Sequence, residues 1–277
     1  MYDCALAVIL SSALLKKPSM YAPIQRILSQ ACIIFIAAVT VASCGYKNGL
    51  GRNEMLFASP VQMAKLSDKV WVRLSKQETF LTSGEDYDHV VDVANRILEA
   101  AYYKPEDWDV VVSENKMTFA YALPNKRLVV SSGLLRQTQS DDQLNDAQLA
   151  AVIGNLVAHV NYSHLSERYS QSPLARDGLT ARRIDEAYEK HRDDVEDILG
   201  IAAAGREPKP FSREHSLTAD KFSIRYMTRA GYDPQEAVAF WTNLAQTSPA
   251  RPVHLAIHPV DNARLRHLSQ EIEFLSK

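Results

Sequence analysis

The chain has 277 residues, a length typical of one or two domains. Hydrophobic residues make up 46% of it and charged residues 23%, which excludes a wholly disordered or fibrous protein. Its 31 Lys and Arg stand against 33 Asp and Glu, so there is no basic excess and we expect no nucleic-acid partner. Three cysteines, Cys4, Cys32 and Cys44, are too few for a disulfide framework or a cysteine-zinc cluster.

The N-terminal region contains two short apolar runs. The second run, Cys32–Ala42, follows Arg26 and ends in small residues around Cys44. It is too short for a good transmembrane helix, which needs about 20 apolar residues. A short apolar run with a positive flank and small residues before a cysteine resembles the signal of a bacterial lipoprotein. We therefore expect cleavage before Cys44 and a lipid on its thiol.

Other interpretations of this region stay open. It is alternatively an uncleaved anchor or a plain secretory signal, and translation starts at either Met1 or Met20. A lipid on Cys44 would hold the chain on a membrane of the bacterial envelope, facing the periplasm. Gly45 follows the cysteine where an inner-membrane retention signal would have Asp. The outer membrane is therefore favoured over the inner one.

The expected organisation is a signal peptide over 1–43, a lipidated cysteine with a tether and short helix over 44–75, and one domain over 76–277. Hydrophobic spacing predicts helices and strands in the order helix, small sheet, several helices. The expected fold class is therefore α+β, mostly helical, with a small β-sheet. The predicted helices cover 61–74, 88–101, 145–170, 180–204, 217–230, 234–246 and 262–275, and the predicted strands cover 108–112, 117–123 and 127–131.

Four separated motifs carry a family resemblance. Residues 145–164 read NDAQLAAVIGNLVAHVNYSH, residues 119–135 read FAYALPNKRLVVSSGLL, and residues 212–234 read SREHSLTADKFSIRYMTRAGYDP. His258-Pro259 follows, with Arg264 and Leu268 at the matching spacing. In this order the motifs resemble the zinc metallopeptidases related to CAAX prenyl proteases, in their bacterial periplasmic lipoprotein branch. The resemblance covers about residues 85–270 and implies a zincin-like fold.

The resemblance also shows which catalytic residues are replaced. In that family two histidines, at i and i+4 of a helix, and a later glutamate hold zinc, and a glutamate after the first histidine is the general base. The first histidine position is Asn155, the base position is Leu156, and the third-ligand position is Thr218. His159 and Asp220 are kept. Asparagine and threonine are poor zinc ligands and leucine cannot take a proton, so we expect a pseudopeptidase with a degenerate site and no cofactor.

A rebuilt metal site is the alternative interpretation. If any metal binds, the resemblance points to His159, His258 and Asp220, with His215 or His254 as additions, and the chain would then be an active zinc metalloendopeptidase. Without metal, His164, Asp220 and His258 remain as residues that once supported the ligands. The charged segment over 180–204 is expected to be solvated, with a lid over the site as its alternative.

A binding role would survive the loss of metal. In the fold that the resemblance implies, the strand beside the metal helix is an edge that pairs with an extended peptide through backbone groups. The residues assigned to that edge are Arg127, Leu128, Val129, Val130 and Ser131. We expect the partners to be envelope proteins or peptides, with the membrane contacted through the lipid on Cys44. A purely structural subunit of an envelope assembly is the third hypothesis.

Overall fold

The computed structural model describes residues 46–47, 53–54, 56–137, 139–140, 143–177, 181–201, 208–246, 253–255 and 260–277. The chain divides into two compact units, Met1–Gly45 and Tyr46–Lys277, and only the second contains described residues. The expected signal peptide, Cys44 and His258 lie outside the described residues. No helix within the described part is long and apolar enough to cross a membrane.

A mixed five-stranded sheet lies at the centre of the second unit, in the order β3-β4-β6-β5-β9. β4 and β6 are parallel, β5 and β6 form an antiparallel hairpin, and β9 lies parallel to β5. The hairpin turns through Lys126, whose φ of 60° is left-handed. The three strands predicted from the sequence are confirmed to within two residues. The strands are β3 Phe80–Leu81, β4 Asp109–Ser113, β5 Thr118–Leu123, β6 Arg127–Ser131 and β9 Val253–His254.

The prediction that Arg127–Ser131 forms a free edge is wrong. This segment is β6, which pairs with β4 on one side and with β5 on the other. The tight hairpin turn places β5 outside β6, so β5 is the strand that runs beside α6 (Asp146–Asn161). Among the described residues, β9 pairs with Thr118 and Phe119 of β5. Within the described residues, the rest of β5 has no strand on that side.

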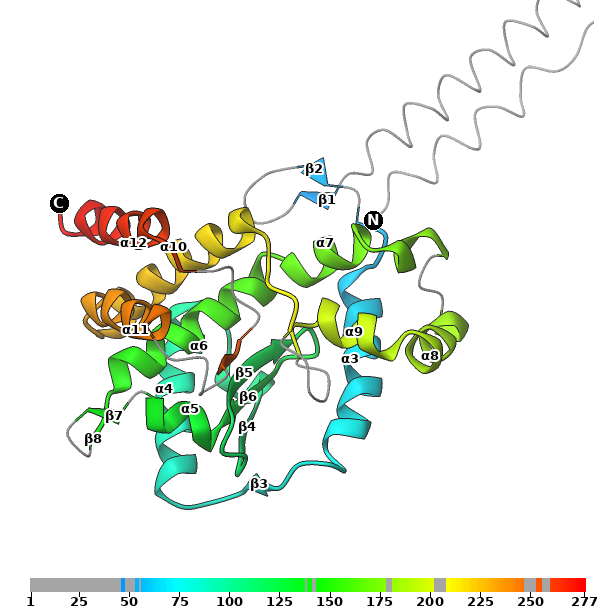
Figure 1. Cartoon of the computed structure of the whole chain (residues 1–277), viewed down its shortest axis with the longest axis horizontal. Coiled ribbons are helices and arrows are strands. Elements are labelled where there is room, and N and C mark those ends of the chain that lie inside the picture. The colour runs from blue at the N-terminus through cyan, green and yellow to red at the C-terminus, as the bar shows by residue number, and fades with distance from the viewer. Residues whose placement is uncertain are drawn as a thin grey trace, which may run out of the picture. The chain divides into compact units, whose positions relative to one another are not determined.

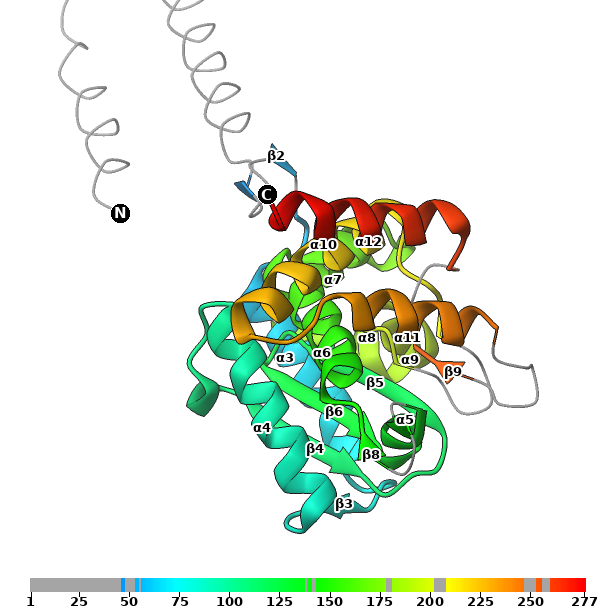
Figure 2. The same ribbon diagram turned by 90° about the vertical axis from the view of Figure 1, so that its left-hand side faces the viewer.

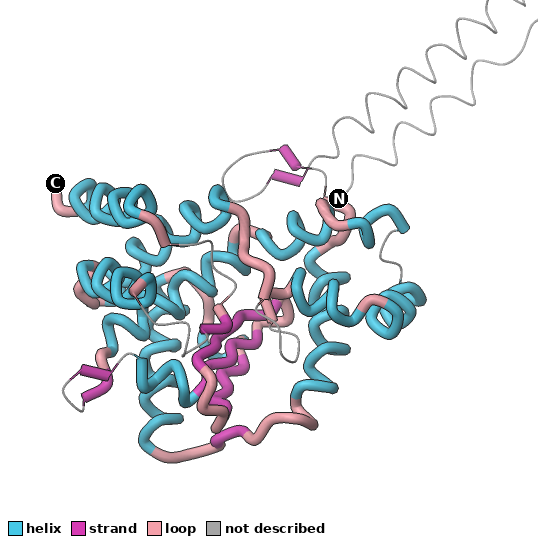
Figure 3. The backbone as a smooth tube through the Cα atoms, in the orientation of Figure 1, coloured by secondary structure: helices cyan, strands magenta, loops and turns pink. Residues whose placement is uncertain are grey.

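Helices cover both faces of the sheet, as Figure 1 and Figure 3 show. Figure 2 gives the same arrangement from the side, with α10, α11 and α12 near one another. α10 and α11 pack on α6, and α12 packs on both of them. The helices are α3 Pro60–Leu74, α4 Glu85–Ala100, α5 Ser132–Gln137, α6 Asp146–Asn161, α7 His164–Ser170, α8 Ala181–Lys190, α9 Arg192–Ile198, α10 Arg213–Ala230, α11 Gln235–Ala245 and α12 Asn262–Leu275. The short elements are the 3-10 turns Pro105–Asp107 and Pro173–Asp177 and the strand pairs β1 Tyr46–Lys47 with β2 Asn53–Glu54 and β7 Gln139–Ser140 with β8 Gln143–Leu144.

Each face of the sheet belongs to a different hydrophobic core. Successive side chains of a strand point to opposite faces. In β5, Ala120 and Ala122 join the core of α4, α6, α10 and α11, whereas Tyr121 and Leu123 join the core of α3, α7, α8 and α9. The two cores therefore share the sheet as a common wall. The fold class expected from the sequence, mostly helical α+β with a small sheet, is confirmed.

Two helices predicted as continuous are each divided into two. The segment 145–170 forms α6 and α7, separated at Ser163, whose φ of 58° is left-handed. The segment expected to be helical over 180–204 forms α8 and α9, which meet at His191 with φ −130° and ψ 40°. Such backbone conformations end a helix. The break at Ser163 changes the chain direction between α6 and α7, and His164 at the start of α7 lies against His159.

Candidate functional site

The crossing of α6 and α10 positions the candidate site. The two helices approach closely at Gly154, where an added Cβ would lie 2.8 Å from the Ser223 hydroxyl oxygen. That hydroxyl donates a hydrogen bond of 2.8 Å to the Ala151 carbonyl oxygen on α6. Glycine at this position allows the close approach of the helix backbones. As a result, the residue after Gly154 faces Asp220 across the crossing.

Asn155, in the position of the family's first zinc ligand, is held by a buried ion pair. Its amide Nδ2 donates to Asp220 Oδ1 at 2.9 Å. Arg264 on α12 donates to both carboxylate oxygens of Asp220, from Nε at 2.6 Å and from Nη2 at 2.8 Å. The Asp220 and Arg264 side chains are 0% and 2% exposed, and the guanidinium lies 4.7 Å from the centre of the Trp241 ring. Bidentate pairing of this kind is strong and directional, so Asn155 is fixed toward Asp220.

His159, in the position of the family's second ligand, is enclosed by two rings. Its Nδ1 shares a hydrogen bond of 3.0 Å with Nδ1 of His164, in which one ring donates and the other accepts. The Phe211 ring stacks on the His159 ring at 3.8 Å between centroids. Burial, with the nearby positive charge of His164 and His215 in their protonated forms, lowers the pKa of His159 well below its ordinary value. The imidazole is therefore neutral at neutral pH.

A second buried pair continues from His164. The ring of His164 stacks on that of His215 at 4.3 Å. Nε2 of His215 lies 2.7 Å from Oε2 of Glu167, and these two side chains are 7% and 5% exposed. Three imidazoles and one carboxylate thus form a chain from α6 through α7 to α10. Glu167 and Phe211 were not among the sequence-predicted residues, because neither stands in a family motif.

The other residues predicted from the sequence lie partly at the site and partly away from it. Leu156 packs against the core of α4, α6 and α10 and also lines the site. Thr218 is half-buried on α10. The residues of β6 are buried in the sheet apart from half-buried Arg127, so they do not form the site. The structure thus brings Asn155, Leu156, His159, His164 and Asp220 together at the helix crossing.

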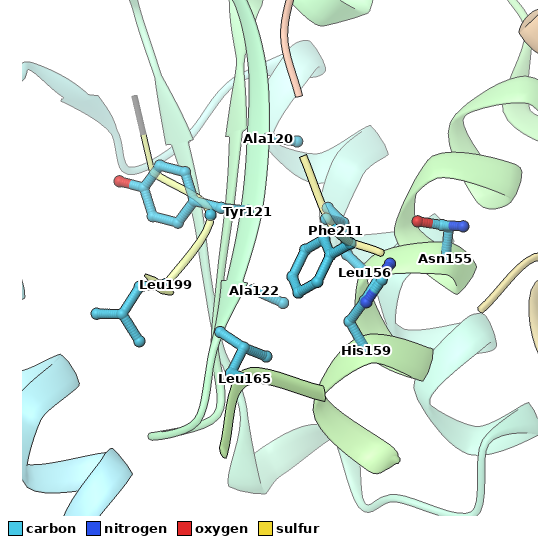
Figure 4. Close-up of a pocket in the computed structure, with 10 residues that line it drawn as sticks. Ala120, Tyr121, Ala122, Asn155, Leu156, His159, Leu165, Leu199 and Phe211 are labelled. Carbon is cyan, nitrogen blue, oxygen red and sulfur yellow. The ribbon is translucent and has the colours of Figure 1, made fainter. Parts of the chain in front are cut away.

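The chain itself fills the space that a substrate would need. The remaining cavity has a volume of about 10 Å³, the space of one water molecule. Residues of β5 and α6 form its walls, and Leu199 and Gly200 come from the segment after α9. Figure 4 shows Phe211 inserted between β5 and the helix that carries Leu156 and His159. The segments on both sides of 202–207 therefore close the site.

The described residues do not fit a zinc ion. A catalytic zinc site needs three protein ligands and one open position. His159 supplies one imidazole, while Asn155 is bonded to Asp220, and both oxygens of Asp220 accept from Arg264. Among the described residues, no group of three or more His, Cys, Asp or Glu side chains is arranged to hold a metal ion. Zinc chemistry therefore has no ligand set in this part of the chain.

The sheet with a crossing helix pair on one face defines a zincin-like metallopeptidase domain. The sequence profile of Peptidase family M48 matches residues 86–272, and the chain belongs to that family. The resemblance seen in the sequence is thereby confirmed at the level of the family.

Three relatives illustrate the relationship. The chain is 28% identical over 166 residues to "Mitochondrial metalloendopeptidase OMA1" of Arabidopsis thaliana, covering 59% of this chain and 31% of that protein. It is 27% identical over 154 residues to "Beta-barrel assembly-enhancing protease" of Escherichia coli (strain K12), covering 53% and 30%. It is 28% identical over 157 residues to "Metalloprotease YcaL" of the same strain, covering 55% and 58%. The chain thus spans less than two thirds of the length of each relative.

Proposed function

We propose that this chain is a catalytically inactive member of Peptidase family M48, anchored by lipid in the bacterial envelope, that binds or scaffolds envelope proteins or peptides. The observation that carries the proposal is the buried bond between Asn155 and the Asp220–Arg264 pair. It occupies the position of the first zinc ligand with a neutral amide that already has a partner. The residual cavity of about 10 Å³ supports the same conclusion, since no peptide bond fits in it.

The chemistry at the neighbouring positions supports the loss of catalysis. A metallopeptidase needs a carboxylate or equivalent base to take a proton from the metal-bound water. Leu156 has no titratable group, and its side chain packs with the core residues of the same helix face. Thr218 offers a hydroxyl in place of the third carboxylate ligand. Even with a metal ion bound, the Leu156 position would supply no general base for hydrolysis.

The envelope location is supported by the sequence and by one relative. The motif around Cys44 has the form of a lipoprotein signal, and Gly45 favours the outer membrane over the inner one. One bacterial relative is named for enhancing β-barrel assembly. We propose that the lipid on Cys44 supplies the membrane contact and that residues 76–277 form the family domain that faces the periplasm.

A binding role for the groove between β5 and α6 requires a local rearrangement. Backbone groups of β5 after Phe119 have no strand partner on the α6 side within the described sheet, so an extended peptide can add there. Phe211 and Leu199 now cover this edge. We propose that peptide binding displaces the segment carrying Phe211. A purely structural subunit would bind its partner through an outer face and leave Phe211 in place. Displacement of Phe211 on binding therefore distinguishes a peptide-binding role from a structural one.

The test is the metal content and casein hydrolysis of the full chain, purified without chelator or added metal. We expect far less than one zinc per chain by elemental mass spectrometry and no zinc-dependent hydrolysis, with a commercial zinc metallopeptidase as the positive control. His159→Ala should change neither result. Zinc at about one equivalent, together with hydrolysis that His159→Ala abolishes, would refute the proposal.

The alternative function is an active zinc metalloendopeptidase with a rewired site. It would use His159 and His258, with Asp220 as a further ligand. The bidentate bonds from Arg264 to Asp220 weigh against that third ligand, because a metal would have to replace them. His258 lies outside the described residues, so the discriminating variant is His258→Ala. It removes bound zinc if the alternative holds and changes nothing if the site is inactive.

A further inference from the structure

Helix α3, the first helix after the expected lipid anchor, has an outer side that faces solvent. Its inner side packs into the core shared with α7, α8 and α9, through Met63, Leu66, Val70 and Leu74. On the opposite side, Val61 and Val72 are 64% and 54% exposed. They lie about three turns apart, so both project from the same side of the helix. The proposed peptide binding at β5 does not use this side of α3.

Lysine side chains accompany the two valines. Lys65 lies on the outer side about one turn after the first valine, and Lys76 follows the C-cap residue of the helix; both are exposed. Lys69 also lies on this side and already interacts within the chain. Asp68 is the acidic residue here, and its carboxylate accepts a hydrogen bond of 2.7 Å from Nδ2 of Asn125. The outer side therefore has more positive than negative groups, although the whole chain has a net charge of −2.

The end of α3 nearest the anchor is apolar. Phe57 comes two residues before the N-cap Ser59 and is 54% exposed. Its backbone N–H donates to the Ser170 hydroxyl oxygen of α7 at 2.9 Å, which holds this part of the chain to the domain. Single exposed apolar side chains are ordinary, but Phe57, Val61 and Val72 follow one element together with lysines. Apolar and basic side chains combined in this way are typical of helices that lie on an anionic membrane surface.

The chain between Cys44 and α3 has a short reach. β1 pairs antiparallel with β2, which places Tyr46 opposite Glu54. Cys44 comes two residues before Tyr46, and Phe57 comes three residues after Glu54. At no more than about 3.6 Å per residue and about 5 Å across the strand pair, the chain can place Phe57 at most about 25 Å from Cys44. A lipid on Cys44 would therefore keep the apolar end of α3 close to the bilayer.

We propose that the outer side of α3, together with Phe57, docks on the anionic phospholipid surface of the membrane that holds the lipid on Cys44. The apolar side chains enter the boundary between headgroups and acyl chains, and Lys65 and Lys76 lie over phosphate groups. The inference rests on the proposed lipid anchor, because a tether raises the local concentration of the bilayer around this side of the helix. Docking fixes the orientation of the domain on the membrane, which a lipid on a tether alone does not.

The test measures how fast lysines of the full chain are acetylated by a water-soluble reagent, with peptide mass spectrometry as the readout. The chain is bound to vesicles of phosphatidylcholine alone or of phosphatidylcholine and phosphatidylglycerol in equal parts. We expect Lys65 and Lys76 to react about fivefold more slowly on the mixed vesicles, and high salt to restore their reactivity. Lys104 and Lys116, which are exposed and lie outside α3, are the matched controls and should react equally on both. The same digest shows whether Cys44 carries a lipid.

Variants assign the protection to the apolar part of this side. Val61→Ser combined with Val72→Ser removes two exposed apolar side chains, so the fold should be unaffected. On the mixed vesicles, Lys65 of this variant should react as fast as on phosphatidylcholine. Met117→Ser is the matched control, because Met117 is 45% exposed and lies between β4 and β5. It should leave Lys65 protected, and protection that survives the double valine variant would refute the assignment.

The outcomes separate the docking from the anchor. Equal reactivity of Lys65 and Lys76 on the two kinds of vesicle would overturn the docking proposal. With a lipid on Cys44, that result leaves the proposed anchor standing; without one, both proposals fall. Protection on the mixed vesicles without a lipid on Cys44 would support the docking and refute the anchor. Protection in native envelope membranes but not on the mixed vesicles would mean that a protein covers this side of α3, and would refute docking on lipid.

Discussion

The site has two halves that are held together in different ways. On the α10 side, Asn155, Asp220 and Arg264 form a compact bonded unit whose charges balance. On the α7 side, His159, His164, His215 and Glu167 form a chain of rings that Phe211 covers. The first half consists of residues in the family motifs. Glu167 and Phe211 of the second half lie outside them.

This difference shows that the two halves meet two distinct requirements. The buried Asp220 carboxylate needs a positive partner, and Arg264 supplies one with two hydrogen bonds. The buried His159 imidazole is kept neutral, and the Phe211 ring covers it. We therefore expect the first half to depend on charge pairing and the second on packing and pH. The predictions below test that division.

The largest effect is expected for Arg264→Met. It keeps an apolar side chain near Trp241 but leaves the Asp220 carboxylate buried, with Asn155 as its remaining side-chain donor among the described residues. Removing one partner of a buried pair typically costs about 3–5 kcal/mol. Denaturant unfolding measures the loss. The control is Arg213→Met, which breaks the exposed pair with Asp261 and should cost about 0–1 kcal/mol. Similar losses for both variants would contradict the special role of the buried pair.

Phe211→Ala is expected to have the next largest effect, in the second half. Phe211 is 5% exposed and stacks on His159, and Phe→Ala changes in cores cost about 3–5 kcal/mol. We expect about 3 kcal/mol, because the neighbouring cavity already lowers the packing density. The variant should also expose His159 to diethyl pyrocarbonate, detected by peptide mass spectrometry.

The control for Phe211→Ala is Phe274→Ala near the C-terminus. Phe274 is 66% exposed, so this substitution should change the stability by less than about 0.5 kcal/mol and leave His159 protected. If Phe211→Ala left His159 unmodified, the ring would not be what closes the site. If a peptide ligand of the wild type is found, Phe211→Ala should bind it more tightly, because the peptide no longer has to displace the Phe211 ring.

Much of the fold follows from local patterns in the sequence. α12 was predicted with its observed bounds, Asn262–Leu275, because its apolar spacing is regular and Asp261 caps it. The end of α10 was predicted at Ala230 because Gly231, with φ of 80°, ends a helix well. Four of the five replaced or kept motif positions on α6 and α10, namely Asn155, Leu156, His159 and Asp220, also lie together as the resemblance implies.

The features that sequence analysis missed are non-local or have no pattern. The central place of β6 depends on which strands pair, and alternation alone does not determine the order of strands. The break at Ser163 is a left-handed residue that is not glycine, which no propensity predicts. Phe211 lies in an irregular segment, so periodicity gives no sign that it covers the site. Arg264 was seen as part of a motif, but its pairing with Asp220 required the structure.

A smaller effect is expected from pH, and it separates the two halves. The pKa of His159 is lower in the folded chain than its unfolded value of about 6.5, so the unfolded chain takes up the proton more readily. The contribution of the neutral His159 imidazole to the free energy of unfolding is therefore complete above about pH 6.5 and is lost as the pH falls below that value. One proton taken up on unfolding changes the free energy of unfolding by at most about 1.4 kcal/mol per pH unit, so stability should fall as the pH drops below about 6.5. His159→Gln should flatten this part of the stability curve, and an unchanged slope would contradict the neutral imidazole.

The smallest effect is expected at the helix crossing that both halves share. In Gly154→Ala the new Cβ would meet the Ser223 side chain at 2.8 Å, so one helix must shift, which costs about 1 kcal/mol or somewhat more. Ser223→Gly removes the hydroxyl and Cβ contacts, together with the hydrogen bond to Ala151, and leaves only the Cα at 3.2 Å from the new Cβ. In a double-mutant cycle, Gly154→Ala should therefore cost less in the Ser223→Gly background than in the wild type. If the two changes were additive, the crossing would be loose, and the close approach of α6 and α10 would not explain how Asn155 is held against Asp220.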